Sequence, residues 1–307
     1  MGSQPLVTIV TPCLNRAGMI AAAIESVRDQ DYGGEIEHLV MDGGSTDGTL
    51  ETLARYPHVT VLSEPDEGLY DALNKGIARA RGAVVGLLNS DDAYRRDAVG
   101  NAVAVLLDRP SAAMACGGAA VVARDGNAGT IIRRYDAAEN RNLDPADVLL
   151  GVPIVNARFY RRGLFDAVGL FDTRYKIVAD RDFLLRAALA GAKAASIPEV
   201  VYEYGSHSGS LTIGGLESRR RIAEETIVMT EAWLSRTPPV PPSAARSLKR
   251  LHAQCMLTCM ADGARRGDFA ALRACLRRGT ALNGAWPLDA AGAAGAWAVR
   301  RLRLLGA

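Results

Sequence analysis

The sequence predicts an α/β fold in which a doubly wound, mixed sheet is followed by a helical extension. In the first ninety residues, short apolar runs rich in β-branched side chains alternate with segments whose apolar residues recur at helical spacing. The runs are continuously apolar, which indicates that helices cover both faces of a largely parallel sheet. From residue 215 onward the pattern is helical. We therefore expect an α/β domain over residues 1–214 and a helical extension over residues 215–307.

Four strands and the helices between them are expected in the first part of the chain. The strands are residues 6–11, 36–41, 59–62 and 84–88. The helices are residues 19–27, 50–53, 71–81 and 99–107. Residues 112–122 and 129–135 flank the turn Arg124-Asp125-Gly126-Asn127, so a hairpin should extend the sheet in antiparallel fashion.

The later part of the chain returns once to the sheet before it becomes helical. A helix is expected over residues 183–189 and a strand over residues 194–204. The Pro-rich run at residues 238–242 must interrupt the helices of the extension. Beyond it, residues 248–264 and 269–276 should form a helical hairpin.

Composition limits the class of protein. Of the 307 residues 49% are apolar and 23% are charged, as in folded proteins, and a net charge of +2 gives no reason to expect a nucleic-acid partner. Five cysteines without zinc-ligand spacing, and a first segment unlike a signal peptide, fit reduced thiols in the cytoplasm. No stretch approaches the ~20 apolar residues of a membrane span.

Polar residues collect where the expected parallel strands end. These clusters are residues 11–16, Asp42, residues 63–66 and residues 89–92. In a doubly wound sheet the ligand lies outside the carboxyl ends of the strands. A single polar loop could be only a turn or a helix cap, as Asn15 and Ser45 could be, but four together favour a ligand site.

The sequence carries no glycine-rich loop of the kind that cradles phosphates. Phosphates would then have to be held by a cation, and Asp91 and Asp92 offer the oxygen ligands that Mg²⁺ and Mn²⁺ prefer. The alternative is that the Asp pair caps the next helix. Lys75 lies four residues after Asp71, so these two side chains could form no more than an ordinary ion pair on a helix.

Four ordered motifs resemble glycosyltransferase family 2, and most closely its bacterial exopolysaccharide and colanic-acid type. They are residues 7–15, 41–49, 63–76 and 87–92, within a resemblance that covers residues 6–210. The resemblance implies a GT-A fold, a nucleotide-sugar donor, a divalent metal (Mn²⁺ or Mg²⁺), inversion at the anomeric carbon, and a polysaccharide or lipid-linked acceptor.

The resemblance also assigns roles to residues of this sequence. The expected donor-binding residues are Thr11, Pro12, Asn15, Arg16, Asp42, Asp71, Lys75, Asn89 and Ser90. The expected metal ligands are Asp91 above all, then Asp92 and His207, although the sequence around His207 favours a surface loop histidine over a ligand. Asn89 stands where the family's Asp-x-Asp motif has its first Asp.

The catalytic base is expected near residue 180. Residues 178–186 resemble the family's acidic segment, with Ala179-Asp180 at the position of the usual Glu-Asp pair. This alignment makes Asp180 the base, with Asp182 as the competing choice. Asp180 could also do no more than cap the helix that follows.

Two other functions remain open from the sequence. A nucleotidyltransferase would need a glycine-rich first loop, which residues 11–16 lack. A nucleotide-sugar-binding protein without turnover, acting as a partner in polysaccharide assembly, would not need the acidic set Asp91, Asp92 and Asp180.

The C-terminal tail combines apolar and aromatic residues with arginines. The first group is Trp286, Trp297, Val299, Leu302, Leu304 and Leu305, and the second is Arg300, Arg301 and Arg303. This pattern favours peripheral contact with the anionic inner face of the cytoplasmic membrane. The alternative is a terminal helix packed on its own domain or on a second subunit of an oligomer.

Overall fold

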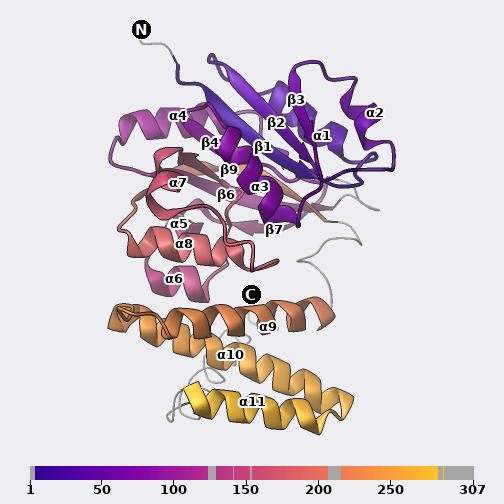
Figure 1. Cartoon of the computed structure of the whole chain (residues 1–307). Coiled ribbons are helices and arrows are strands. Elements are labelled where there is room, and N and C mark those ends of the chain that lie inside the picture. The colour runs from indigo at the N-terminus through magenta and orange to yellow at the C-terminus, as the bar shows by residue number, and fades with distance from the viewer. Residues whose placement is uncertain are drawn as a thin grey trace. The chain divides into compact units, whose positions relative to one another are not determined.

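A computed structural model describes residues 4–123, 129–140, 142–152, 154–206, 216–282 and 286 (Figure 1). These residues form two compact units. One unit contains the described residues up to Asp144 together with residues 154–206, and the other contains residues 145–152 together with the described residues from 216 onward. The sequence patterns gave no sign that residues 145–152 join the C-terminal helices. The division expected at residue 214 falls outside the described residues.

A nine-stranded mixed sheet forms the centre of the first unit. Its parallel half consists of β1 (Val7–Cys13), β2 (Ile36–Asp42), β3 (Val59–Ser63) and β4 (Val84–Leu87), in the order β3-β2-β1-β4. The other strands are β5 (Ala93–Tyr94), β6 (Met114–Ala123), β7 (Ile131–Tyr135), β8 (Arg158–Arg161) and β9 (Ala194–Ser206). The expected doubly wound, mixed sheet is confirmed.

The second half of the sheet is mixed in direction. β8 is antiparallel to both β4 and β6, β6 is parallel to β9, and β7 pairs with β6 as the predicted antiparallel hairpin. The turn expected at residues 124–127 lies outside the described residues. β5, which follows the loop after β4, pairs with β9 in antiparallel fashion. This pairing ties the loop after β4 to β9.

Helices cover both faces of this sheet (Figure 1). The helices of the first unit are α1 (Ile20–Arg28), α2 (Thr49–Leu53), α3 (Leu69–Arg79), α4 (Ala98–Asp108), α5 (Ala137–Asn140), α7 (Gly163–Val168) and α8 (Ala179–Leu189). One core contains side chains of α1, α4 and the strand residues Ile9 and Phe159. On the other face α3 approaches so closely that a Cβ on Gly76 would stand 2.3 Å from Val10.

The second unit is a helical assembly of α6 (Pro145–Leu150), α9 (Leu216–Leu234), α10 (Pro242–Arg266) and α11 (Phe269–Leu282). α10 begins at Pro242, so the Pro-rich run separates two helices as predicted, and α10 and α11 form the expected hairpin. Ile227, Ala253, Met256 and Trp286 make up its core. No described helix is long and apolar enough to cross a bilayer.

Trp286 corrects one part of the expected membrane contact. Its side chain is only 6% exposed, and it packs against Gly279, where a Cβ would stand 2.6 Å from the indole. Trp286 therefore belongs to the core of its own unit, because an aromatic ring that fills a glycine's place is withdrawn from any outside surface. The other tail residues named above, from Trp297 to Leu305, lie outside the described residues.

Candidate active site

The loops after β1 and β2 are joined by hydrogen bonds between residues about thirty positions apart. The Asn15 backbone N–H donates to Ser45 Oγ at 2.8 Å, and the Thr46 N–H donates to Asn15 Oδ1 at 2.9 Å. Two further bonds run from Arg16 N–H to Thr49 Oγ1 and from Ala17 N–H to an Asp47 oxygen. Asn15 has φ of 54°, a left-handed conformation that asparagine tolerates. The two loops therefore form one rigid wall.

Asp42 at the end of β2 is the centre of this wall. Its carboxylate is buried and accepts hydrogen bonds from the Ser45 hydroxyl, the Ser63 hydroxyl at 2.6 Å, and the backbone N–H groups of Gly44 and Ser45. Burial by itself raises the pKa of the Asp42 carboxyl, but these hydrogen bonds outweigh it and hold the pKa below its ordinary value. Asp42 is thus an ionised anchor, and base recognition by it stays a prediction.

The last residues of β1 lead directly into the first loop of the wall. Thr11 and Pro12 are both buried, and the Thr11 hydroxyl lies 2.9 Å from His38 Nε2 on β2. Burial lowers the pKa of His38 to about 3, so the imidazole stays neutral. Direct contact of Thr11 and Pro12 with a donor stays a prediction.

Lys75 on α3 is surrounded by acceptors. Its Nζ lies 3.0 Å from Asp71 Oδ2 and 3.9 Å from Glu64 Oε1, and it donates to the Pro65 carbonyl at 2.8 Å. The expected ion pair with Asp71 is confirmed. The hydrogen bond that Lys75 donates to Asp71 raises the pKa of Lys75, so the ammonium remains charged and is held beside the loop after β3.

At the end of β4, one carboxylate is an internal anchor. Asp92 is buried and accepts hydrogen bonds from Tyr202 Oη at 2.7 Å, the Gly205 N–H at 2.8 Å and Asn89 Nδ2 at 3.0 Å. Burial raises its pKa to about 7, helped by the charge of Asp91 and opposed by these bonds. Asp92 therefore ties the β4 loop to β9, and a role as a metal ligand stays a prediction.

The neighbours of Asp92 differ in exposure. Ser90 is buried, whereas Asn89 and Asp91 are half-buried. Asn89 Oδ1 accepts a long hydrogen bond of 3.4 Å from Asn156 Nδ2, a residue that sequence reasoning did not single out. Asp91 is thus the more accessible carboxylate of the pair, which suits the primary metal role expected for it.

The two candidates for the catalytic base differ in how far their side chains are buried. Asp182 is buried, and its Oδ2 accepts from Arg186 Nε at 2.9 Å. Arg186 also donates to the carbonyls of Val168, Gly169 and Leu170. Asp180, in the first turn of α8, is half-buried. Arg186, paired with Asp182, therefore ties α8 to the carbonyls of residues 168–170, while Asp180 is the more accessible carboxylate.

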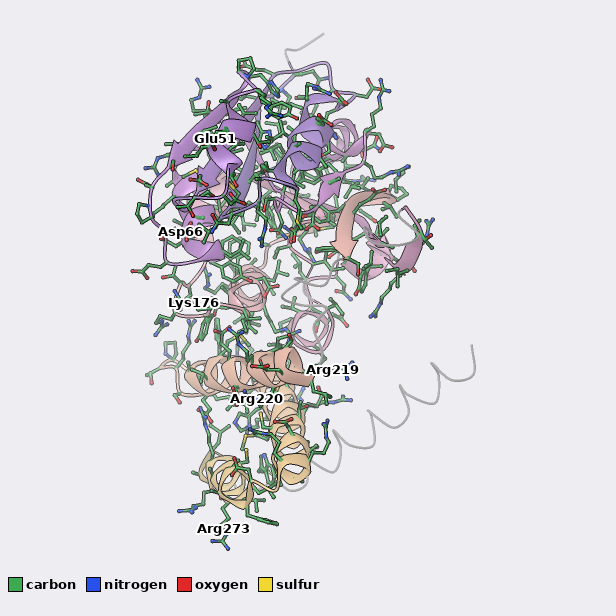
Figure 2. The ribbon with its side chains drawn as sticks, turned by 90° about the vertical axis from the view of Figure 1, so that its right-hand side faces the viewer. Glu51, Asp66, Lys176, Arg219, Arg220 and Arg273 are labelled. Carbon is green, nitrogen blue, oxygen red and sulfur yellow. The ribbon has the colours of Figure 1, made fainter. Side chains whose placement is uncertain are left out.

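Contacts with α3 hold the segment that precedes α8. Asn74 exchanges two hydrogen bonds with the backbone of Phe171, at 2.8 and 2.9 Å, and Tyr70 Oη donates to the Ile177 carbonyl at 3.0 Å. Lys176 Nζ donates to the Glu67 carbonyl at 2.8 Å. Figure 2 shows Lys176 and Asp66 on neighbouring segments of this region. Tyr70 and Asn74 lie within the recognised motif at residues 63–76, but their positioning role was not predicted.

Tyr204 on β9 is a shared neighbour of the β4 loop and of α8. Burial raises the pKa of its phenol well above the ordinary value, and the negative charges of Asp92 and Asp180 raise it further. Its ring also lies 4.8 Å from that of Tyr202, centroid to centroid. Because both carboxylates act on one phenol, the expected base and the β4 loop lie in the same region of the unit.

The described residues could bind a metal ion only together with ligands from the substrate. They contain no group of three His, Cys, Asp or Glu side chains that could hold a metal by themselves. Asp91 offers one accessible carboxylate, and Mg²⁺ is commonly bound by one or two carboxylates together with substrate phosphates. The donor set therefore fits an ion that arrives with a diphosphate. His207 lies outside the described residues.

The strand order and the polar loops at one edge of the sheet define a protein of the GT-A class, and comparison with solved structures agrees. The mannosyltransferase PcManGT from Pyrobaculum calidifontis, in complex with GDP-Man and Mn²⁺, superposes with a TM-score of 0.59 at 24% identity, covering 95% of this chain and 84% of that one. S. aureus TarS 1-349 in complex with UDP-GlcNAc gives 0.57 at 17% identity, covering 88% and 90%.

Sequence comparison defines the family. Residues 8–169 match the family model described as Glycosyl transferase family 2. A PGL/p-HBAD biosynthesis glycosyltransferase of Mycobacterium tuberculosis is 29% identical over 247 residues, which cover 75% of this chain and 92% of that protein. The chain therefore belongs to glycosyltransferase family 2.

Proposed function

We propose that this glycosyltransferase is metal-dependent and moves a sugar, with inversion, from a nucleoside-diphosphate sugar to a hydroxyl of a saccharide or lipid-linked acceptor. One observation carries the proposal: Asp180 is a half-buried carboxylate in the first turn of α8, a helix that Arg186 ties to the carbonyls of residues 168–170. Its negative charge and that of Asp92 both raise the pKa of Tyr204. A base must face both the acceptor and the sugar, and this arrangement provides a carboxylate near the loop expected to hold the diphosphate.

Two parts of the site would bind the donor: the wall formed by the loops after β1 and β2, and Lys75. The wall built from Asn15, Asp42 and Ser45 would receive the nucleoside, and its internal hydrogen bonds keep it in shape before the donor arrives. Lys75 adds a fixed positive charge beside Glu64 and Pro65, in the loop after β3. Pre-formed sites of this kind lose little free energy to ordering when the ligand binds.

The chemical step assigns one proton transfer to Asp180. As the acceptor oxygen attacks the anomeric carbon, the Asp180 carboxylate takes the proton of that hydroxyl, and the bond from the anomeric carbon to the diphosphate oxygen breaks with its electron pair. Attack from the face opposite the leaving group inverts the configuration. A divalent ion held by Asp91 would supply positive charge for the departing diphosphate.

The relatives support the donor and acceptor classes without fixing either. The two solved structures hold GDP-Man with Mn²⁺ and UDP-GlcNAc. The mycobacterial relative is named for PGL/p-HBAD biosynthesis, and a Bacillus subtilis relative for teichuronic acid biosynthesis. We propose that this chain works on the cytoplasmic side of the membrane, where lipid-linked acceptors of polysaccharide assembly are presented.

A thermal-shift panel of nucleotide sugars, with Mn²⁺ or with EDTA, tests the proposal together with measured release of nucleoside diphosphate. We expect one donor to raise Tm only with metal, and Asp91→Ala to abolish both this rise and turnover. Asp108→Ala, which removes an exposed carboxylate of the same unit, is the matched control. Undiminished transfer in EDTA would reject the metal, and metal-dependent binding without turnover would identify a binding protein instead.

A further inference from the structure

The outer face of α11 carries two exposed apolar side chains. Phe269 is 70% exposed and Leu276 is 43% exposed. They are seven residues apart, so at 100° per residue they project from nearly the same side of the helix. Solvent-facing aromatic and aliphatic side chains on one stripe cost free energy unless something covers them.

Arginines lie on the same stripe and no acid does. Arg273 and Arg277 are exposed and follow Phe269 by four and eight residues, which places them beside it on the helix surface. Figure 2 shows Arg273 projecting from α11 away from α9 and α10. The helix from Phe269 to Leu282 contains no Asp or Glu. The third arginine, Arg278, is already paired with Glu231 on α9, with Nε 2.5 Å from Oε1.

The opposite face of α11 is occupied by the unit's own core. Cys275 packs against the cluster of Ile227, Met256 and Trp286, and Gly279 makes room for the Trp286 ring. Gly263 on α10 faces Leu272 and Ala271. This face is therefore filled from within the unit, whereas Phe269 and Leu276 keep much of their surface exposed.

Charge separates the two partners that such a face could have. In a symmetric dimer centred on this face of α11, the two copies of Arg273 would face each other across the two-fold axis, and like charges facing each other oppose association. An anionic bilayer attracts arginines at its surface while it accepts Phe and Leu among the acyl chains. The combination of stripe and charge therefore fits lipid better than protein.

We propose that the α11 face formed by Phe269, Arg273, Leu276 and Arg277 docks on an anionic membrane surface, with the helix lying in the plane of the bilayer. The four residues precede the tail beyond residue 286 in the sequence, and the proposal does not depend on the donor chemistry proposed above. It would hold the enzyme at a lipid surface by apolar insertion and by attraction to acidic headgroups.

Co-sedimentation of the full chain with vesicles tests this surface. We expect binding to mixed phosphatidylcholine and phosphatidylglycerol vesicles, and weak binding to phosphatidylcholine alone. An arginine near an anionic surface contributes about 1 kcal/mol, so Arg273→Gln with Arg277→Gln should weaken partitioning about 30-fold. Phe269→Ser should weaken it roughly tenfold by removing apolar insertion.

Matched variants keep the test specific. Arg55→Gln with Arg96→Gln removes two exposed arginines of the first unit, and Leu107→Ser removes an exposed apolar residue of α4. These controls should bind vesicles like the parent chain. Equal loss in the controls, no loss in the α11 variants, or no binding by the parent chain would each overturn the proposal. A dimer in analytical ultracentrifugation that Phe269→Ser dissociates would assign the face to a second copy and overturn it as well.

Discussion

Two regions at the carboxyl edge of the parallel strands use carboxylates in different manners. In the loops after β1 and β2, Asp42 is buried and its oxygens are satisfied by Ser45, Ser63 and backbone N–H groups. At the end of β4 and the start of α8, carboxylates come in pairs of unequal exposure. Asp92 and Asp182 are buried, whereas Asp91 and Asp180 are half-buried.

This difference in carboxylate burial indicates which region should form the binding pocket and which should carry out the chemical step. A carboxylate with every oxygen satisfied keeps its neighbours in place, because moving it would strand several donors at once. A pair with one anchored and one accessible member keeps the accessible member on a fixed backbone. The first region is therefore suited to a pre-formed pocket wall, and the second to holding an ion and moving a proton.

The largest expected effect comes from the accessible member of the α8 pair. Asp180→Asn keeps the size of the side chain but removes its ability to take a proton. General bases contribute about 10²–10⁴-fold, so turnover should fall by that factor while the donor's Kd stays near the parent value. Initial-rate kinetics with donor titration measure both. If Asp180→Asn turns over normally, the comparison between the two members of the pair is wrong.

The anchored member of the same pair should act on stability instead. Asp182→Asn leaves the Arg186 charge without its carboxylate, and breaking a buried ion pair costs about 3–5 kcal/mol. We expect a loss near 3 kcal/mol in the free energy of unfolding, because Arg186 retains three carbonyl acceptors. Urea unfolding measures it. Full stability together with lost turnover would instead make Asp182 the base.

His38 on β2 contacts Thr11 at the end of β1, and it should make the stability of the protein depend on pH. The pKa of His38 is depressed from 6.5 to about 3 by burial, so the unfolded chain takes up the proton more readily. Its stabilising contribution is therefore present above pH 6.5 and is lost as the pH falls. Between pH 7.5 and 5 this histidine should remove about 2 kcal/mol from the free energy of unfolding. His38→Gln should flatten that part of the profile, and an unchanged slope would contradict the assignment.

The smallest expected effect concerns one donor to the Asp42 anchor. Ser63→Ala removes the 2.6 Å hydrogen bond to Asp42, and hydrogen bonds to charged groups contribute about 1.5–3 kcal/mol. We expect a loss of about 1.5 kcal/mol, because Asp42 keeps its bonds from Ser45 and Gly44. Thr60→Ala, at an exposed position of the same strand, is the control. Equal stability of both variants would show that the hydrogen bond from Ser63 to Asp42 does not stabilise the wall.

Much of the fold was predictable because apolar periodicity reports burial directly. The first four strands, the helices between them and the helical hairpin after Pro242 lie where their patterns indicated. β8 was not predicted, because Arg158 and Arg161 interrupt the apolar pattern that indicates a buried strand. Arg158 is buried, with Nε donating to the Ile154 carbonyl at 2.8 Å, and no local pattern predicts an arginine inside a sheet. Asn74 and Tyr202 were missed for a similar reason, since their partners are distant in sequence.

Sequence patterns were enough to predict the family, the strand ends where polar residues gather, and the pairs of carboxylates that compete for each role. The helical period also determined that Asp180 and Asp182, two residues apart, cannot share one side of α8. Only the tertiary structure decided which side is buried. That choice depends on Arg186 reaching the carbonyls of residues 168–170 and on α3 holding Phe171, contacts between segments that no local pattern encodes. Burial is a property of the packed molecule, so the exposure that separates an anchor from a candidate base arises only when the chain has folded.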